Sequence, residues 1–340
     1  MSSWPADGLE RVRGCPVCGA GRSFVLHEGL TDSVFFCAPG NWTLRGCESC
    51  ASAYLDPRPT PGSIGLAYQY YFTHADAPSF ESLGPVARIR RRLANGYRNR
   101  RFGTSDYPAS FLGFPLMFLL PRFKAIVDAG MRHLPPRPDG GRLLDLGCGN
   151  GAFLLRARSA GWETVGVDLD PQAVKAAHKH GLDVRLGGVE ILDAASEQFD
   201  VITMSHVIEH VHDPLKVLAA CACLLRPGGL LWLETPNICS VGHDEYGPHW
   251  RGLEPPRHLV IFSPAALEKA LADAGFSKVE VLPYRRVCQE TFRASAAIAA
   301  GVDPYSCNTP DVPAKRIARA ERLAKEDSGH REFITLQARK

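Results

Sequence analysis

The sequence predicts an α/β protein with a Rossmann-like core built on a seven-stranded sheet, preceded by a cysteine-rich module and a helical connector. Three observations support this. From Arg142 onward, apolar strand patterns, glycine turns and amphipathic helix patterns alternate. Two CxxC pairs precede this region, and the stretch between them and Arg142 has a largely helical pattern. The composition, with 45% hydrophobic and 22% charged residues, is that of a globular protein.

Turn-rich joints divide the 340 residues into three predicted segments. "DPRPTPG" at Asp56–Gly62 and "PPRPDGG" at Pro135–Gly141 carry the proline and glycine that interrupt regular structure. We therefore predict a metal-binding module over 1–60, a helical connector or lid over 61–140, and an α/β domain over 141–340 with a helical insertion at about 285–328. The net charge of +3 is small for this length and disfavours a dedicated nucleic-acid binder.

Seven strands are expected in the α/β segment, each a short apolar run bounded by turn residues. They cover 142–147, 163–169, 183–187, 199–205, 230–237, 277–284 and 332–340. The helices between them carry recognisable end signals. Pro171 stands in the first turn of one helix and Gly181 follows its end, whereas Ser263 is the expected N-cap of another, with Pro264 next to it.

Four cysteines predict a structural zinc site near the N-terminus. Cys15 and Cys18 form one CxxC pair, and Cys47 and Cys50 form the other. Each such turn presents two sulfurs to one ion, and four thiolates complete a tetrahedron without an open position for chemistry. Zinc would replace the hydrophobic core that so short a segment cannot build alone. A redox role or a merely structural role for the thiols is the alternative.

No segment is long enough to predict a membrane span. The N-terminus has no apolar secretory region. The longest apolar run, Phe111–Leu120, is about half of the ~20 residues that cross a bilayer. We expect this run to be buried or to form one wall of a substrate pocket, with contact to a membrane surface as the alternative. Cytoplasmic localisation is the default expectation.

The stretch "LLDLGCGNG" at Leu143–Gly151 predicts a ligand-binding loop between a strand and a helix. Its glycines let the backbone turn sharply and let a ligand approach it closely. The spacing is G-x-G-x-G with Asp145 ahead of it, whereas nicotinamide-binding loops read G-x-G-x-x-G. Asp168 ends the next strand, where a carboxylate can accept hydrogen bonds from both hydroxyls of a ribose.

The glycine loop, this second acid, "FDVITMSHVIEHVHDP" and "LRPGGLLWLETPN", in this order, resemble class I S-adenosylmethionine (SAM)-dependent methyltransferases. A subset of these enzymes carries an N-terminal CxxC zinc ribbon, followed by "DPRP" and an aromatic run similar to "YQYYF". The resemblance implies SAM as the cofactor, with its ammonium and sulfonium beside an acid. The residues expected to line the SAM site are Asp145, Gly147, Cys148, Gly149, Gly151, Asp168, Leu169, Val189 and Ser205.

The acceptor side is predicted around His206, which directly follows the strand over 199–205. Substrates of such folds approach beyond the carboxyl ends of the strands. An imidazole titrates near neutrality, so His206 could be a general base for an acceptor hydroxyl. Packing against SAM or capping the next helix is the alternative. His258 is the second catalytic candidate.

"HVIEH", from His206 to His210, raises the question of a second metal. In ubiquinone-pathway O-methyltransferases, which this stretch resembles, an E-x-x-E-H pattern binds a divalent cation. Here His206 takes the place of the first glutamate, ahead of Glu209 and His210. Helical spacing would still put the three side chains on one face. Structural hydrogen bonding is the alternative, and the sequence leaves the choice open.

Two further segments are candidates for substrate binding. The connection after the strand over 230–237 is long for such a link, and we predict a lid with the candidates His249, Trp250, Arg251, Arg257 and His258. Alternatively, Arg257 and His258 pin this loop to the core. Arg88–Arg101 contains seven arginines and no acid. It predicts either a solvated helix face or a clamp for an anionic acceptor.

These features predict a SAM-dependent methyltransferase with structural zinc, acting on a small-molecule or sugar-linked acceptor. O-methylation is the first expectation, with C- and N-methylation open. One alternative is an RNA methyltransferase that uses the zinc ribbon and the arginine run. Another is a non-catalytic SAM-binding protein. Nucleic acid is not expected as a partner, and homodimer formation and the identity of the acceptor are left open.

Overall fold

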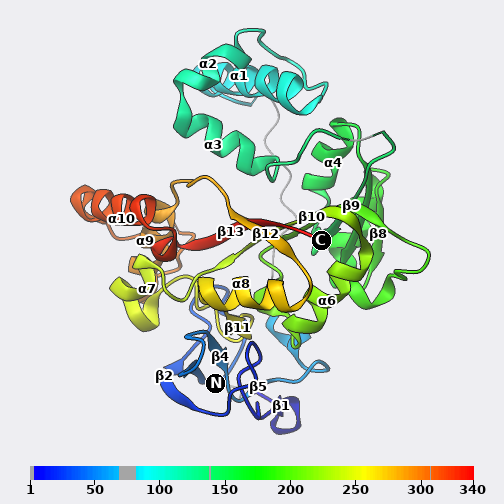
Figure 1. Ribbon diagram of the computed structural model, residues 1–340. Helices are drawn as coiled ribbons and strands as arrows, with labels where there is room; N and C mark the ends of the chain where they lie inside the picture. The colour runs from blue at the N-terminus through cyan, green and yellow to red at the C-terminus, as the bar shows by residue number, and fades with distance from the viewer. Residues whose placement is uncertain (1–3, 69–81, 138, 307) are drawn as a thin grey trace. The chain divides into compact units, whose positions relative to one another are not determined.

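The computed structural model describes residues 4–68, 82–137, 139–306 and 308–340 (Figure 1). The chain forms two compact units and passes repeatedly between them. Met1–Tyr71, Ser205–Ala222 and Leu233–Arg339 belong to unit 1. Phe72–Met204 and Cys223–Trp232, together with Lys340, belong to unit 2. The sequence boundaries near 60 and 140 stay predictions.

Seven strands form a mixed sheet in the order β12-β13-β10-β9-β6-β7-β8. β6 pairs in parallel with β7 and with β9, β7 pairs in parallel with β8, and β12 pairs antiparallel with β13. Their bounds are β6 Arg142–Leu146, β7 Glu163–Asp168, β8 Asp183–Leu186, β9 Phe199–Ser205, β10 Leu225–Pro236, β12 Ser277–Val281 and β13 Phe333–Arg339. Each falls on a predicted strand, although β10 begins earlier than expected. The predicted fold class is confirmed.

The central parallel strands β6 and β9 are largely buried, which explains their nearly continuous apolar sequences, whereas the edge strand β8 is partly exposed. Leu143 and Leu144 of β6 are fully buried. Helices α4 (Ala152–Ser159) and α5 (Pro171–Lys179) contribute side chains to the same core. Asp170 caps α5 by accepting a hydrogen bond from the Gln172 N–H at 2.7 Å, and Pro171 opens the helix as expected.

The cysteine-rich module lies in unit 1 and contains a small antiparallel sheet in the order β11-β4-β3-β2. β2 (Ser23–Leu30), β3 (Trp42–Cys47) and β4 (Ala53–Leu55) come from the module itself, and β1 (Leu9–Glu10) pairs with β5 (Arg58–Pro59) beside them. β11 (Val260–Ile261) comes from the long connection after β10 and pairs with β4. This connection is therefore part of the module's sheet.

Of the remaining helices, α8, α9 and α10 fall where helices were predicted, whereas α7 lies in the connection that was predicted to be a lid. Ser263 caps α8 by accepting a hydrogen bond from the Ala266 N–H, as its sequence indicated. The α-helices and the 3-10 turns used below are α6 Pro214–Leu224, α7 Val241–Tyr246, α8 Pro264–Asp273, α9 Cys288–Ala299, α10 Ala314–Glu326, η3 Val189–Ile191 and η4 Ile208–His210.

Unit 2 also holds α1 (Pro85–Phe102), α2 (Gly113–Leu119) and α3 (Pro121–Gly130), which lie together at the top of Figure 1. The expectation that the run Phe111–Leu120 is buried is wrong for most of its residues, and its other form, one wall of a substrate pocket, stays a prediction. Gly113 and Met117 are buried, but the exposed fractions of Phe111 and Leu119 are 89% and 76%. The reason is that α2 is apolar on all sides, but the described residues pack against only one of them.

No helix in the described parts of the chain is long and apolar enough to cross a membrane. The aromatic run at Tyr68–Phe72, which supported the resemblance, lies outside the described residues except for Tyr68.

Candidate cofactor and acceptor sites

The glycine loop links β6 to α4 within unit 2. Gly149 and Gly151 have φ angles of 55° and 80°, a region that glycine adopts without strain. A Cβ atom added at Gly149 would meet no atom within 4 Å, whereas one at Gly151 would lie 2.3 Å from Leu182 Cδ1. The loop therefore leaves open space for a ligand at Gly149 and packs tightly against its surroundings at Gly151.

Asp168 meets the glycine loop from the end of β7. One of its carboxylate oxygens accepts a hydrogen bond from the Gly149 N–H at 2.7 Å, and the other accepts one from the Asp170 N–H at 2.9 Å. Each oxygen of a carboxylate can accept more than one hydrogen bond. The carboxylate thus lies directly beside the open part of the loop, where ligand hydroxyls could reach it.

Asp145 is fully buried at the base of the same loop. Its Oδ1 accepts a hydrogen bond from the Thr203 hydroxyl at 2.9 Å and is paired with Arg132. Within the described residues, its Oδ2 has no hydrogen-bond partner. Burial raises the pKa of Asp145, and the ion pair with Arg132 opposes this. An unsatisfied buried acceptor costs about 1–3 kcal/mol, so this oxygen fits a cationic donor such as the ammonium of SAM.

Arg132 is a site residue that the sequence interpretation missed. It donates a hydrogen bond to the Thr203 hydroxyl at 2.8 Å, and its guanidinium lies 3.9 Å from the centre of the Phe153 ring. A second aromatic ring, that of Trp232, is 5.4 Å away. Arg132 lies between α3 and β6, outside any recognised motif, so only the folded chain shows its pairing with Asp145.

The other predicted cofactor residues take varied positions. Cys148 is buried, and burial raises the pKa of its thiol. Leu169 is exposed, and Val189 is half-buried at the start of η3. Glu190, the residue after Val189, accepts a hydrogen bond from the Gly188 N–H at 2.8 Å. The structure thus brings Asp145, the loop and Asp168 together, and the roles of Leu169, Val189 and Ser205 stay predictions.

His206 of unit 1 lies between two carboxylates. Its Nδ1 is 3.2 Å from Glu209 Oε1, and its Nε2 is 3.5 Å from Glu234 Oε1. Burial alone would lower the pKa of His206, but hydrogen bonds to both carboxylates raise it to about 10. The backbone is also unusual, because φ is 53° and the His206 N–H donates to the Glu234 carbonyl at 2.8 Å. Such conformations concentrate at functional positions.

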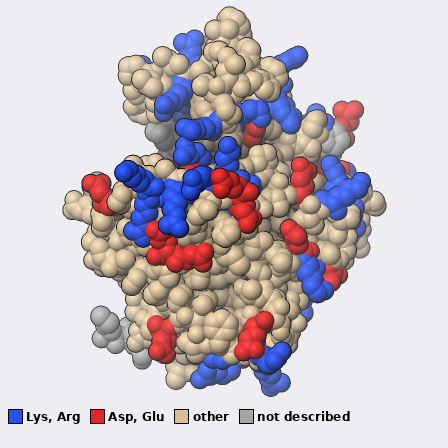
Figure 2. Space-filling view, turned by 60° about the vertical axis from the view of Figure 1, so that its left-hand side comes forward, with Lys and Arg blue, Asp and Glu red and all other residues tan. Residues whose placement is uncertain are grey.

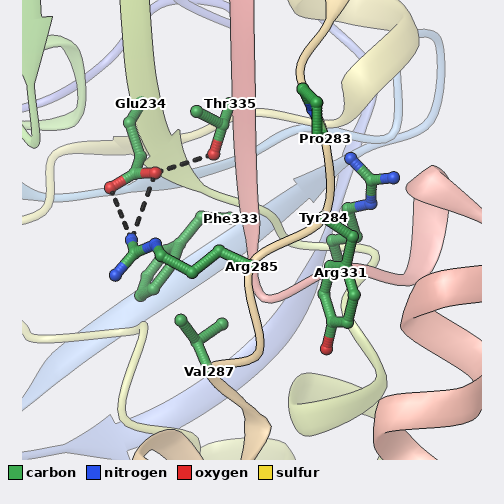
Figure 3. Close-up of a pocket in the computed structure, with 8 residues that line it drawn as sticks. All are labelled: Glu234, Pro283, Tyr284, Arg285, Val287, Arg331, Phe333 and Thr335. Carbon is green, nitrogen blue, oxygen red and sulfur yellow. Dashed lines mark hydrogen bonds and ion pairs between the residues drawn. The ribbon is translucent and has the colours of Figure 1, made fainter. Parts of the chain in front are cut away.

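Glu209 and Glu234 are both held by further hydrogen bonds. Glu209 is fully buried and accepts a hydrogen bond from the Thr235 hydroxyl at 2.9 Å. Glu234 pairs with Arg285 at 3.0 Å and accepts from the Thr335 hydroxyl at 2.7 Å, as Figure 3 shows. Burial tends to raise the pKa of each carboxyl, but His206 lowers both pKa values to about 2. The imidazole is therefore fixed between two anions.

The pocket drawn in Figure 3 is too small for an acceptor. Its volume is about 20 Å³, which is room for about one water molecule. It is lined by Glu234, Pro283, Tyr284, Arg285, Val287, Arg331, Phe333 and Thr335. Its walls fix Glu234 and thereby the position of the carboxylate that faces His206.

The predicted second catalytic residue, His258, is buried close to Glu209 and His210. Potential ligand atoms of these three residues lie within 4.8 Å of one another. The Nδ1 atoms of His210 and His258 lie 3.0 and 2.8 Å from backbone carbonyls of Arg257 and Gly252. Burial lowers the pKa of His258 to about 4. These hydrogen bonds account for the placement of the imidazoles, so the cluster by itself indicates no metal.

The expectation of a substrate lid after β10 is wrong for Trp250 and Arg257. Trp250 is 1% exposed and donates a hydrogen bond to Glu332 at 2.8 Å. Arg257 is fully buried, pairs with Asp32, and donates to the Ala67 carbonyl at 2.9 Å. Burial alone would raise the pKa of the Asp32 carboxyl, but the hydrogen bond and the charge of Arg257 lower this pKa. The loop is pinned to the cysteine-rich module, which was the alternative interpretation of Arg257.

The four cysteines converge as their spacing predicted. Sγ of Cys15 lies 3.6 Å from Sγ of Cys50, and Sγ of Cys18 lies 3.5 Å from Sγ of Cys47. A tetrahedral zinc ion with Zn–S bonds of about 2.3 Å requires sulfurs about 3.8 Å apart. These distances are far too long for disulfides. The four thiols therefore fit one zinc ion and leave no ligand position open.

The two CxxC turns share one backbone geometry. The Gly19 N–H donates to the Cys15 carbonyl at 2.8 Å, and the Ala51 N–H donates to the Cys47 carbonyl at 3.1 Å. Both residues after the second cysteine of each pair have positive φ angles, 72° at Gly19 and 56° at Ala51. The equivalent turns explain how two distant sequence segments present their sulfurs to a common point.

A protein-family profile described as a methyltransferase domain matches residues 119–281. The chain is also similar to ubiquinone biosynthesis O-methyltransferases. The relative from Xanthomonas campestris pv. campestris is 43% identical over 107 residues, which cover 29% of this chain and 44% of the relative. The relative from Parvibaculum lavamentivorans is 36% identical over 154 residues, which cover 41% of this chain and 60% of the relative. The chain thus spans about half the length of these relatives.

Solved structures of SAM-dependent methyltransferases are also similar. One from Thermotoga maritima aligns with a TM-score of 0.44 and 21% identity, covering 67% of this chain and 94% of that structure. The profile match includes the glycine loop and Asp168, and it extends over the His206 region.

Proposed function

We propose that the protein transfers a methyl group from SAM to a small-molecule acceptor. The premise is that residues 119–281 form a methyltransferase domain of the class I SAM-dependent type. The observation that carries the proposal is the unsatisfied Oδ2 of Asp145, buried beside a glycine loop that has space for a ligand. The ammonium of SAM would satisfy this oxygen, and Asp168 would accept hydrogen bonds from the ribose hydroxyls.

We propose an oxygen nucleophile on the acceptor. SAM, when bound, supplies a methyl group on a cationic sulfur. In its neutral form, His206 would take the proton that the acceptor hydroxyl loses through Nε2, the nitrogen that lies 3.5 Å from Glu234, because Glu209 orients the ring from Nδ1. Glu234 would remain on Arg285 and Thr335. The curated relatives are named as O-methyltransferases, which supports this choice, and sugar-linked hydroxyls belong to the same acceptor class.

The direct experiment is incubation of the purified protein with methyl-labelled SAM and fractionated small metabolites, followed by mass analysis. We expect label on an oxygen of a small molecule. Label that enters only RNA would favour the alternative in which the zinc ribbon and the arginine run bind nucleic acid. Binding of SAM without label transfer to any fraction would contradict an enzymatic role.

The proposed base makes a pH prediction. At neutral pH the pKa of about 10 keeps His206 protonated between its two carboxylates. The fraction of neutral imidazole, and with it the methyl-transfer rate, should therefore rise about tenfold per pH unit from pH 7 towards the pKa. His206→Gln should lower the rate about 100-fold and leave SAM affinity unchanged. His180→Gln, on the exposed end of α5, is the control, and a flat pH profile would contradict the base role.

We also propose that the four cysteines bind structural zinc. The sulfur distances and the two equivalent turns support this metal. The ion would stabilise the sheet β11-β4-β3-β2, to which the connection after β10 is joined. Zinc would thus contribute to the folding of unit 1 and take no part in methyl transfer.

A further inference from the structure

Helices α2 and α3, with the segment that leads into α2, carry an apolar surface that the proposed function does not use. We define this apolar face by its large exposed side chains: Tyr107, Phe111, Phe118, Leu119, Leu120 and Ile126. Tyr107, Phe111 and Leu119 are 92%, 89% and 76% exposed. Soluble proteins seldom expose large contiguous apolar surfaces, and such surfaces mark sites of interaction.

The sequence of α2, GFPLMFL, explains why this face is exposed. It contains no polar side chain, yet the helix buries only Gly113 and Met117, against the small core that includes Tyr97 and Val127. A helix that is apolar all round is normally surrounded by apolar material. The outer side of α2 is therefore matched to an apolar environment that the described residues do not supply.

A groove between α1 and the segment leading into α2 adds a second feature. It has a volume of about 500 Å³ and is lined by Gly96, Asn99, Arg100, Ala109, Ser110, Phe111, Phe114 and Pro115. Its floor is a close backbone contact, because a Cβ atom at Gly96 would lie 1.8 Å from the Ser110 carbonyl oxygen. The groove thus brings Arg100 together with Phe111, which belongs to the apolar face.

The charge on α1 identifies the kind of partner. The helix carries seven arginines and no acid. Arg92, Gly96 and Arg100 follow one another at intervals of four residues and so share one side of the helix. Arg92 and Arg100 are both exposed. Figure 2 shows the part of the molecule that carries these helices, at the top of the view, as largely uncharged surface with Lys and Arg side chains around it.

We propose that the apolar face docks on a lipid bilayer rich in anionic phospholipid. The aromatic and aliphatic side chains would enter the interfacial layer, and the arginines of α1 would bind lipid phosphates. This combination of apolar side chains with surrounding cations is that of a peripheral membrane contact. A second copy of the chain is a poorer occupant, because two arginine-rich surfaces would repel each other. The inference does not depend on the proposed methyl transfer.

Vesicle flotation with the full-length protein tests this proposal. We expect the protein to float with vesicles of mixed phosphatidylglycerol and phosphatidylcholine and to stay behind with pure phosphatidylcholine. Phe111→Ser combined with Leu119→Ser, and separately Arg92→Glu combined with Arg100→Glu, should each lower the bound fraction about tenfold or more. Phe36→Ser is the matched control, since Phe36 is 60% exposed in the other unit, and it should bind vesicles like the unmodified protein.

The same variants exclude simpler explanations. Their thermal unfolding and SAM binding should match those of the unmodified protein, so that loss of vesicle binding does not reflect misfolding. Phe111→Trp should show a blue-shifted emission and quenching by brominated lipids only with anionic vesicles. Equal binding of all variants, or no vesicle binding at all, would overturn the proposal. A dimer that dissociates in the Phe111→Ser, Leu119→Ser variant without vesicle binding would assign the face to self-association instead.

Discussion

The cysteine cluster of unit 1 and the glycine loop of unit 2 are both built to hold a ligand, but they are completed in different ways. In the cluster, the sulfurs of four side chains from two equivalent turns lie within 4.8 Å of one another, which suits a complete tetrahedral set of ligands. In the loop, backbone and carboxylates leave open space at Gly149 and an unsatisfied oxygen at Asp145. A closed set of ligands suits a resident ion, and an incomplete set suits a ligand that exchanges in every reaction.

Removal of one cysteine from the cluster should lower the stability of the protein more than any substitution at the glycine loop. Structural zinc contributes about 10 kcal/mol or more to the folding of small zinc domains. Cys47→Ser should therefore abolish zinc binding and unfold the sheet formed by β2, β3, β4 and β11. Metal analysis and limited proteolysis would measure both outcomes.

Cys37→Ser provides the matched control within the same module. Cys37 Sγ contacts the Ala67 carbonyl at 3.4 Å and lies outside the four-cysteine cluster. This variant should keep its zinc and its resistance to protease. If Cys47→Ser retained zinc and stability equal to that of Cys37→Ser, the cluster would not be a metal site and the comparison with the glycine loop would fail.

Loss of the Asp168 carboxylate at the glycine loop should have the second-largest effect. It should weaken SAM binding more than it lowers the stability of the fold. A hydrogen bond to a charged group contributes about 1.5–3 kcal/mol, and Asp168 is proposed to accept two from the ribose. Asp168→Ala should therefore weaken SAM binding about 100-fold in calorimetry. Asp168→Asn keeps one acceptor oxygen, so its SAM affinity should lie between that of Asp168→Ala and that of the unmodified protein.

Asp170→Ala is the control for the effect of Asp168. Asp170 caps α5, so its loss should cost about 1 kcal/mol of stability without a change in SAM affinity. Unchanged affinity in Asp168→Ala, or an equal loss in both variants, would refute the assignment of the ribose site.

The same contrast explains how much could be predicted from the sequence. Some site features depend only on specific residues at a fixed spacing in the sequence. These are the CxxC pairs, the glycine loop and Asp168. The structure brings the four cysteines together, and it brings Asp168 to the glycine loop. The central strands β6 and β9 were predictable for a similar reason, since strands buried on both faces are largely apolar, and β13 was predictable from its alternating pattern. These elements needed no knowledge of distant contacts.

Features that depend on distant contacts were missed or misjudged. Arg132 reaches Asp145 from outside any motif. Arg257 resembled a substrate-binding arginine until its burial against Asp32 was visible. Glu234 lies in a strand, and nothing in its sequence context shows that it faces His206 and changes the proton affinity of that imidazole. Burial and pairing are properties of the folded chain, and they decide what an ionisable residue can do.

The smallest expected effect tests whether the two CxxC turns are truly equivalent. Ala51 occupies a left-handed backbone conformation that costs about 1–2 kcal/mol for a residue with a Cβ atom. Ala51→Gly should relieve this strain and, after the greater unfolded-state entropy of glycine, stabilise the protein by about 0.5–1 kcal/mol. Gly19→Ala, at the matching position with open space around its Cβ, should destabilise it by about 1 kcal/mol through backbone strain alone. Chemical denaturation of the zinc-loaded protein would measure both, and changes of the same sign would show that the two turns do not carry equivalent strain.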